Sequence, residues 1–435
     1  MNKRIIFFLA GTLISGLTLA QDGLSVQSAI EEALSNNPNI RISRSRVEIA
    51  ENNASLGNAG LLPTLSAGAG VNYDVDDVSI QLAGSPDPIE TTGAATNALN
   101  ANLNLNYQVF SGFNNKRTYS KLQLAAAQSE MQSQLEVEGI ILQVAAAFYN
   151  VLRAENNLQI LRNSKAISES RVERSQAAKD LSGGSSIALL NAKVDLNQDS
   201  VELLNANQAL TEARINFNQR LGRDLVNDVV LTAVEELPEL EGHEALKEKM
   251  MSQNPTQINA RLTEQSSLLD YKISNSSYLP QLNFSGSYSY FRNESEGSFL
   301  QLNETLGYGL GLTLSVPLFT GGTRRSAQKN AKILMENSKI LNEETSRTLE
   351  KQLLIAYRDY QNSMQAFELE QTSLETAELN FELSEERFAI GQISNVDFRT
   401  AQLNLLMSQN NLNNLQYNTQ LTALEVLRLS GQLMK

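Results

Sequence analysis

The chain has 435 residues, a formal net charge of −13, one histidine and no cysteine. Without cysteine it can form neither disulfides nor thiolate metal sites, and any Ser-His-Asp triad would depend wholly on His243. The acidic balance also argues against nucleic-acid binding, which needs a basic face. We therefore expect no thiolate or two-histidine metal site and no cofactor, and an enzymatic function is the least favoured class.

The first twenty residues have the layout of a secretory signal peptide. Lys3 and Arg4 precede an apolar run over residues 5–19, and the small Ala20 offers a cleavage point before Gln21. An uncleaved anchor is the alternative, but about fifteen apolar residues are short for a membrane-spanning helix. No other stretch reaches the ~18 consecutive apolar residues of such a helix. An exported protein that spans a membrane would therefore do so with strands.

The mature chain is a tandem duplication. Landmarks early in the two copies, such as Pro38 and Pro255, are 217 residues apart, whereas later ones, such as Phe110 and Phe319, are 209 apart. The first copy therefore has eight extra residues, which we place in a loop over residues 74–97. The divisions are the signal peptide (1–20), repeat 1 (21–223), a linker (224–242) and repeat 2 (243–435).

Each repeat contains two segments in which every second residue is apolar, the pattern of a strand with two environments. They lie at about 61–73 and 98–110 in repeat 1, and at about 279–291 and 306–318 in repeat 2. The polar side is almost purely Asn, Gln, Ser, Thr and Gly, which fits a barrel wall with lipid outside and water inside. We expect four leucines to face hydrocarbon (Leu103, Leu105, Leu312, Leu314) and four polar residues to face water (Asn102, Asn104, Thr313, Ser315).

Long helices follow the strands. No proline interrupts residues 114–179, which predicts a helix on the order of 100 Å long. A break follows at residues 181–185, and then a second helix runs to Leu221. Apolar residues recur in it at seven-residue intervals, the pattern of a coiled-coil seam (Leu189, Leu196, Leu203, Leu210, Phe217). The second copy repeats the seam with Phe398, Leu405, Leu412 and Val426, and Thr419 interrupts it. Each repeat is thus predicted to end in a long helical hairpin.

Four strands cannot close a barrel, and open strand edges are not tolerated in lipid. Closure must therefore come from further chains. Two copies would give eight strands and a filled interior, whereas three would give twelve strands and room for an aqueous lumen. The two long hairpins of each chain favour the larger ring. The predicted fold class is a mixed membrane protein with four transmembrane strands and long α-helical hairpins per chain.

These residues resemble the TolC-type outer membrane efflux protein family over essentially the whole mature chain. The resemblance rests mainly on Val-Pro-Leu-Phe-Thr-Gly-Gly-Thr-Arg-Arg at 316–325, on Leu279-Pro280, and on the second hairpin tip at 387–397. The first copy departs from this pattern at both its strand-to-helix junction and its hairpin tip. The resemblance implies a homotrimer whose twelve-stranded barrel in the outer membrane of a Gram-negative bacterium continues into a periplasmic α-helical barrel.

The resemblance also implies the absence of catalysis, so that the protein is not an enzyme. It implies instead a passive exit duct of a tripartite efflux pump or type I secretion system, joined by a periplasmic adaptor to an inner-membrane pump or ABC exporter. By this analogy, candidate adaptor contacts are the tip residues Ile390, Gly391, Gln392, Leu181, Gly183 and Gly184. Alternatively, the glycines only end a helix. A different class of function also remains, namely a trimeric, barrel-anchored coiled-coil tether or adhesin, which would need no glycine-marked tip.

Asp397 aligns with an acid that the family places at its periplasmic constriction, which makes Asp397 a gate candidate. Three such carboxylates on a threefold axis would repel one another and attract cations. The alternative is a capping box, in which Asp397 and Ser394 together satisfy the start of a helix. The first copy has Ser185 but Ala188 in the matching places, so its turn manages without the acid.

Overall fold

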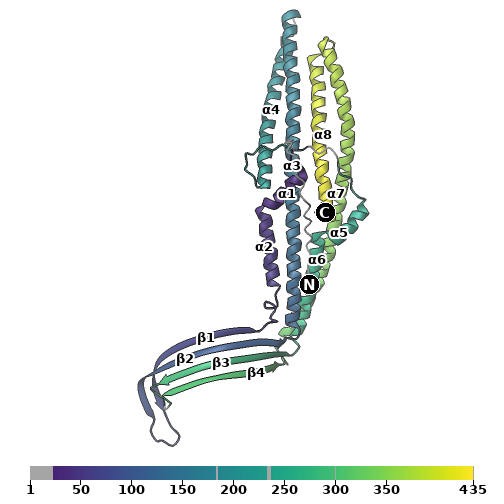
Figure 1. Ribbon diagram of the computed structural model, residues 1–435. Helices are drawn as coiled ribbons and strands as arrows, with labels where there is room; N and C mark the ends of the chain where they lie inside the picture. Colours follow the sequence, from purple (N-terminus) through teal and green to yellow (C-terminus); the bar gives the residue numbers. More distant parts are fainter. Residues whose placement is uncertain (1–22, 183–184, 233–236, 299, 435) are drawn as a thin grey trace, which may run out of the picture. The chain divides into compact units, whose positions relative to one another are not determined.

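A computed structural model describes residues 23–182, 185–232, 237–298 and 300–434 (Figure 1). The predicted signal peptide and the tip residues Gly183 and Gly184 lie outside this range. The chain divides into two compact units. The first, here called the hairpin unit, comprises Met1–Asn37, Gly139–Leu240 and Ala356–Glu425, and the second, the sheet unit, comprises Pro38–Glu138, Glu241–Ile355 and Val426–Lys435.

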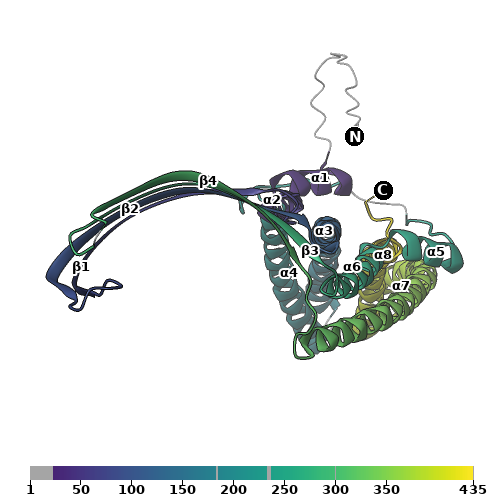
Figure 2. The ribbon, with the colours of Figure 1, turned by 90° about the horizontal axis from the view of Figure 1, so that it is seen from below.

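The sheet unit contains one curved antiparallel sheet with the strand order β1-β2-β3-β4 (Figure 2). Its strands are β1 (Thr64–Ile80), β2 (Ile89–Phe110), β3 (Gln281–Ser295) and β4 (Leu302–Ser315). Each repeat thus supplies one strand hairpin, and β2 pairs with β3 where the two copies meet. Among the described residues neither β1 nor β4 has a strand on its outer edge. The sheet is open at both sides within one chain.

The first strand hairpin is longer than its apolar pattern indicates. The prediction of a loop over residues 74–97 was wrong, because β1 and β2 stay paired as far as Ile80 and Ile89. The pairing has one irregularity, between Asp76 and Val78. Only residues 81–88 connect them. β-branched residues, including Val75, Val78 and Ile80, favour extended backbone here even though the alternation has ended. At the other end β4 stops at Ser315, because Pro317 has no backbone N–H to continue a ladder.

The strand register confirms the predicted division between faces. Leu103 is paired with Tyr288, which is paired with Tyr308, while the next row joins Asn102, Ser289 and Gly307. Leu105, Leu312 and Leu314 share the face of Leu103, and Asn104, Thr313 and Ser315 share the face of Asn102. From the row of Ala101 to the helices, one face therefore collects apolar residues and tyrosine, and the opposite face collects uncharged polar residues and glycine. A side chain at Gly70 would lie only 2.7 Å from Asn100 Oδ1, so the asparagines of β2 occupy the space that the glycines of β1 leave.

Helices continue from the sheet. Within the sheet unit lie α2 (Pro38–Asn53), α5 (His243–Gln253), α6 (Pro255–Ser276) and the first parts of α3 (Asn114–Ser182) and α7 (Thr323–Ala389). Asn254 caps α6 by accepting from the N–H groups of Thr256 and Gln257, and its amide donates to the carbonyl of Leu429. One polar side chain thereby fixes the start of α6 against the end of the chain.

The hairpin unit holds α1 (Val26–Asn36), the remainder of α3 and α7, α4 (Ser186–Leu221) and most of α8 (Asn395–Ser430). Helices α3 and α4 form one antiparallel hairpin, and α7 and α8 form the other (Figure 1). Their core includes Phe148 and Phe217, whose rings meet edge to face at 5.9 Å. The predicted seam of α4 is confirmed, with Leu189, Leu210 and Phe217 buried and Leu196 and Leu203 half-buried. In α8, Thr419 interrupts the apolar series but is fully buried all the same.

One helix among the described residues, Asn114–Asp180 within α3, contains a window as apolar as a membrane-spanning segment. Half of that window is buried inside the protein, and a core helix meets the same criterion. Ile141, Val144 and Phe148 from this helix are indeed core residues, each at most 5% exposed. Packing within the chain therefore accounts for part of the apolar character of α3.

Candidate functional site at the hairpin tips

The turn between α7 and α8 is built around Gly391. Its φ of 74° is left-handed, its N–H donates to the carbonyl of Phe388, and the N–H of Gln392 donates to the carbonyl of Arg387 at 2.8 Å. These two bonds form a Schellman motif, which strongly favours glycine at the left-handed position. The side chain of Ile390 beside it is 68% exposed. The structural role of Gly391 is thus shown, and Ile390 and Gln392 are left as exposed side chains on the turn.

The start of α8 is a reciprocal capping box. The N–H of Asp397 donates to Ser394 Oγ at 3.2 Å, while Asp397 Oδ2 accepts from the Ser394 N–H at 3.2 Å and from Ser394 Oγ at 2.8 Å. This is the helix-start role that the spacing of these residues indicated. Asp397 is exposed, so its carboxylate caps the helix and remains open to solvent.

The tip of the first hairpin follows the second copy in part. Ser185 caps α4 by accepting from the N–H of Ala188 at 3.4 Å, and no acid takes part, as the repeat alignment predicted. Leu181 belongs to the last turn of α3, although its side chain lies outside the described residues. The two tips are joined, because the side-chain amide of Asn395 donates to the carbonyl of Ala188 at 2.8 Å.

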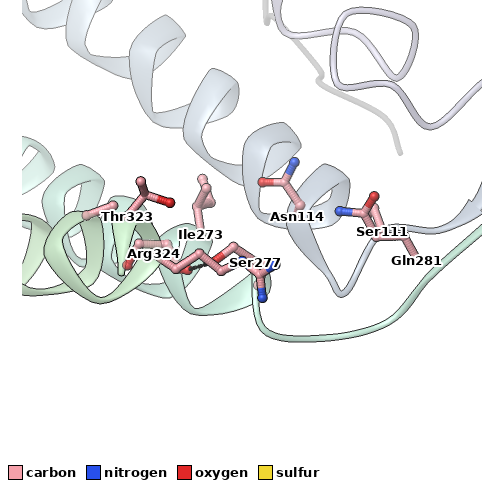
Figure 3. A pocket seen from close by; sticks show the side chains of 10 residues that line it. Ser111, Asn114, Ile273, Ser277, Gln281, Thr323 and Arg324 are labelled. Carbon is pink, nitrogen blue, oxygen red and sulfur yellow. Dashed lines mark hydrogen bonds between the residues drawn. The ribbon is translucent and has the colours of Figure 1, made fainter. Parts of the chain in front are cut away.

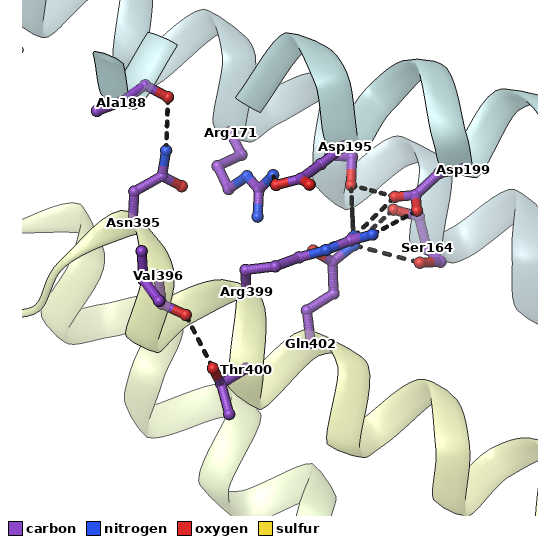
Figure 4. Close-up of polar contacts among 11 residues, drawn as sticks. Ser164, Arg171, Ala188, Asp195, Asp199, Asn395, Val396, Arg399, Thr400 and Gln402 are labelled. Carbon is purple, nitrogen blue, oxygen red and sulfur yellow. Dashed lines mark hydrogen bonds and ion pairs between the residues drawn. The ribbon is translucent and has the colours of Figure 1, made fainter. Parts of the chain in front are cut away.

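A second link between the hairpins lies further along the helices and consists of charged residues (Figure 4). Arg399 of α8 makes two hydrogen bonds to Asp199 of α4, Nη2 to Oδ1 at 2.7 Å and Nη1 to Oδ2 at 2.9 Å. The side chain of Asp199 is 2% exposed, and Ser168 Oγ of α3 donates to its Oδ2. Gln402, one turn after Arg399, donates to the backbone carbonyl of Ser164. One helix of the second hairpin is therefore bonded to both helices of the first.

Arg171 extends this cluster toward α3. Its side chain is fully buried and bonded to Asp195 of α4 through Nη2, while Nε and Nη1 are buried with no hydrogen-bond partner among the described residues. Burial lowers the pKa of Arg171, and the hydrogen bond and charge of Asp195 offset this only in part. Burial also acts to lower the pKa of Arg399, but the hydrogen bonds and charge of Asp199 outweigh it, so the pKa is raised. Two arginines and two aspartates thus neutralise one another in the hairpin unit.

The sequence reasoning missed this cluster, yet one signal was present. Along α4 a second heptad series has the buried residues Ala192, Ala206 and Ala213, and Asp199 stands in that series. A carboxylate in a core position of a coiled coil requires a partner. The partner could not be found by repeat symmetry, because the position of Arg399 in the first copy is Leu190 and that of Asp199 in the second is Ser408. The charges belong to different copies.

These features can be set beside known proteins. A model of the family described as "outer membrane efflux protein" matches residues 29–223 and 246–432, which is most of the chain and corresponds to the two repeats. The chain belongs to the outer membrane efflux protein family. This membership places it in the outer membrane of a Gram-negative bacterium and agrees with the resemblance that the junction and tip motifs indicated.

Individual relatives cover nearly the whole chain. The outer membrane protein TolC of Vibrio cholerae is 23% identical over 100% of this chain and 96% of its own length. The alkaline protease secretion protein AprF of Pseudomonas aeruginosa is 22% identical over 95% of this chain and 86% of its own. Among solved structures, the CmeC outer membrane channel of Campylobacter jejuni aligns with a TM-score of 0.79 at 15% identity, over 98% of this chain and 94% of that one. The efflux-family protein therefore has the fold of an outer membrane channel.

Proposed function

We propose that three copies of this chain form a passive exit duct that crosses the outer membrane and extends into the periplasm. The observation that carries the proposal is the sheet. From the row of Ala101 to the helices it has one apolar face and one uncharged polar face, and its two edges are unpaired among the described residues. Edges of this kind must be paired within a bilayer, so β4 of one copy adds to β1 of the next. Three copies give twelve strands, enough for a water-filled lumen lined by the polar face.

The duct works with partners in the periplasm and inner membrane. We propose a periplasmic adaptor that contacts the hairpin tips, and an inner-membrane pump or ABC exporter that supplies the energy. The exposed side chains of Ile390 and Gln392 support the contact, since an exposed apolar side chain at the turn between α7 and α8 offers the adaptor a binding surface. Leu181, Gly183 and Gly184 complete the proposed contact on the first hairpin. The relatives support both transport routes, because the family is described by efflux and one relative by protease secretion.

We propose further that Asp397 contributes to a periplasmic gate. Its capping role does not compete with this, because the capping bonds from Ser394 are accepted by Oδ2 and the carboxylate stays exposed. Three copies would bring three such charges toward one axis, where they attract cations and repel anions. The ring would be of moderate strength, since Thr400 stands one turn later and adds no second carboxylate.

The test measures assembly and conductance on the same purified sample. We expect a mature chain that begins at or near Gln21, a detergent-solubilised mass of three chains plus detergent, and ion conductance in planar bilayers. A monomer with a closed barrel would refute the architecture. An assembled trimer that conducts no ions under any voltage or in any variant would favour a barrel-anchored tether instead.

A further inference from the structure

The two ends of the sheet carry opposite charge. The segments where strands meet helices, residues 111–121, 271–281 and 316–332, contain eight basic residues and no acid (Lys116, Arg117, Lys121, Lys272, Arg324, Arg325, Lys329, Lys332). The segments at the opposite end, residues 74–97 and 291–305, contain eight acids and only one basic residue, Arg292. In a chain with a net charge of −13, a basic junction without acids requires an explanation.

Four of these basic side chains are engaged within the chain. Arg117 donates to the carbonyl of Lys272 and to Ser276 Oγ, and Arg324 donates to the carbonyl of Pro317 at 2.9 Å. Lys121 pairs with Asp270, and Lys332 pairs with Glu336 at 3.8 Å. Their positions are accounted for by the local structure.

The other four form what we call the basic belt: Lys116, Lys272, Arg325 and Lys329. All four are exposed, and across the residues that the structure describes their side chains have no hydrogen-bond or ion-pair partner. They lie in the first turns of α3 and α7 and the last turns of α6, so three helices bring them to one end of the sheet. Arg325 and Lys329 are four residues apart and therefore share one face of α7.

The belt borders the apolar face of the sheet. The row nearest the helices pairs Leu282 with Leu314, and the exposed Leu318 and Phe319, 91% and 87% exposed, follow in the strand-to-helix connection. Apolar residues next to exposed cations are the arrangement of a membrane interface, where long basic side chains reach the headgroups.

A pocket lies between the same elements (Figure 3). Its volume is about 420 Å³, and its lining includes Asn114, Ser276, Ser277, Thr323 and Arg324. The hydroxyls of Ser276, Ser277 and Thr323 already donate to backbone carbonyls. The amide of Asn114 and the remaining N–H groups of the Arg324 guanidinium are the donors that face phosphate oxygens. The pocket is large enough for one phosphate-bearing headgroup beside the belt.

Taking the proposed outer-membrane duct as given, we propose that the basic belt binds anionic glycerophospholipid headgroups of the periplasmic leaflet. The belt lies at the helical, periplasmic end of the strands, where such headgroups meet the protein. The acidic opposite end would repel them. The preference fixes the depth of the barrel in the membrane, because each cation near an anionic surface adds attraction that decays within a Debye length.

The experiment reconstitutes the full-length mature protein in nanodiscs of phosphatidylcholine and phosphatidylglycerol with identical acyl chains. Native mass spectrometry then counts the lipids that stay bound on release. We expect the unmodified protein to retain phosphatidylglycerol in preference to phosphatidylcholine. In Arg325→Gln/Lys329→Gln this enrichment should fall by about fivefold for each belt residue removed. A second pair, Lys116→Gln/Lys272→Gln, tests the same belt on other helices. The control Lys339→Gln/Lys351→Gln removes two exposed charges from α7 outside the belt and should leave the enrichment unchanged.

Equal binding of both lipids by the unmodified protein would overturn the proposal, as would full enrichment in both belt variants. If the belt variants lost the mass of the trimer but kept the phosphatidylglycerol enrichment, the belt would lie against a neighbouring copy and not against lipid. If equimolar inorganic phosphate displaced the lipid, the site would be one for free phosphate. Conductance recorded from the same nanodisc preparation, transferred to planar bilayers, separates the two hypotheses. A conducting channel without lipid preference refutes the belt alone, whereas absence of conductance refutes the duct.

Discussion

Arg399 and Asp199 face each other across two helical hairpins and bond through both guanidinium Nη groups and both carboxylate oxygens, at 2.7 and 2.9 Å. Their side chains are 13% and 2% exposed. A bidentate pair this deeply buried fixes the relative rotation of α4 and α8, since neither group can turn away without losing both bonds.

Removing one partner of this pair should be costly. Asp199→Ala leaves Arg399 buried with no carboxylate, and we expect the free energy of unfolding to fall by about 3–5 kcal/mol. Denaturant unfolding of the purified protein measures the loss. The double variant Asp199→Ala/Arg399→Leu removes both charges, with leucine at position 399 as at the equivalent Leu190 of the first copy, and should recover most of the loss.

An exposed pair provides the matched control. Lys121 and Asp270 are 2.6 Å apart, and their side chains are 41% and 48% exposed. Asp270→Ala should cost no more than about 1 kcal/mol. Similar losses for Asp199→Ala and Asp270→Ala would show that the buried pair has no special weight.

Asp397 can be tested for cap and gate separately. Asp397→Ala removes both the charge and the acceptor of the capping box, so we expect higher conductance, weaker cation block and a stability loss of about 1 kcal/mol. Asp397→Asn keeps an acceptor oxygen for Ser394 but carries no charge. It should reproduce the change in conductance and block with little loss of stability.

The gate proposal fails if both variants conduct and are blocked as the unmodified channel is, while Asp397→Ala alone lowers the melting temperature. Asp397 would then be a helix cap only. Trimer mass in detergent is measured for each variant, so that a change in assembly is not mistaken for a change in gating.

The two faces of the sheet should differ in their tolerance of charge. Leu105 lies on the apolar face, paired with Leu65 and Gly286, and its neighbour Asn104 lies on the polar face. Leu105→Arg should destabilise the barrel by about 2–4 kcal/mol because the guanidinium enters hydrocarbon, and Asn104→Arg by far less because its side chain meets water. Reversible folding into lipid vesicles gives both values, and equal costs would mean that the faces are assigned wrongly.

A buried tyrosine predicts alkaline sensitivity of the helical hairpins. Burial raises the pKa of Tyr149 to about 12, and the neighbouring Tyr417 contributes in the same direction. The folded state therefore holds this proton more tightly than the unfolded chain, whose tyrosine pKa is about 10. The resulting stability is complete below pH 10 and is lost as the pH rises toward 12, by an amount on the order of 2 kcal/mol.

Unfolding measured between pH 9 and about 12.5 tests this, because the window spans both pKa values. Tyr149→Phe should flatten the pH dependence, whereas Tyr119→Phe, elsewhere on α3, should not. An unchanged slope in Tyr149→Phe would assign the alkaline loss to other groups.

The faces of the strands and the turns between the helices were determined by local sequence. Alternation in the strands depends only on the pleat, which sends successive side chains to opposite faces, so Leu103 and Asn102 could be assigned before their partners were known. The glycine turn at Gly391 and the capping box of Ser394 and Asp397 also lie within a few residues of sequence. Because the chain repeats itself, the order of two strands followed by a helical hairpin could be read twice.

Only the tertiary structure decided the rest. Asp199 and Arg399 are 200 positions apart in sequence and come from different copies, so no spacing or repeat could pair them. The free belt cations are likewise distinguished from the engaged ones only by which carbonyls and carboxylates lie within reach, as for Arg324 and Arg325. Periodicity determines which face a residue occupies, whereas the partner of a buried or exposed charge depends on how distant helices pack together.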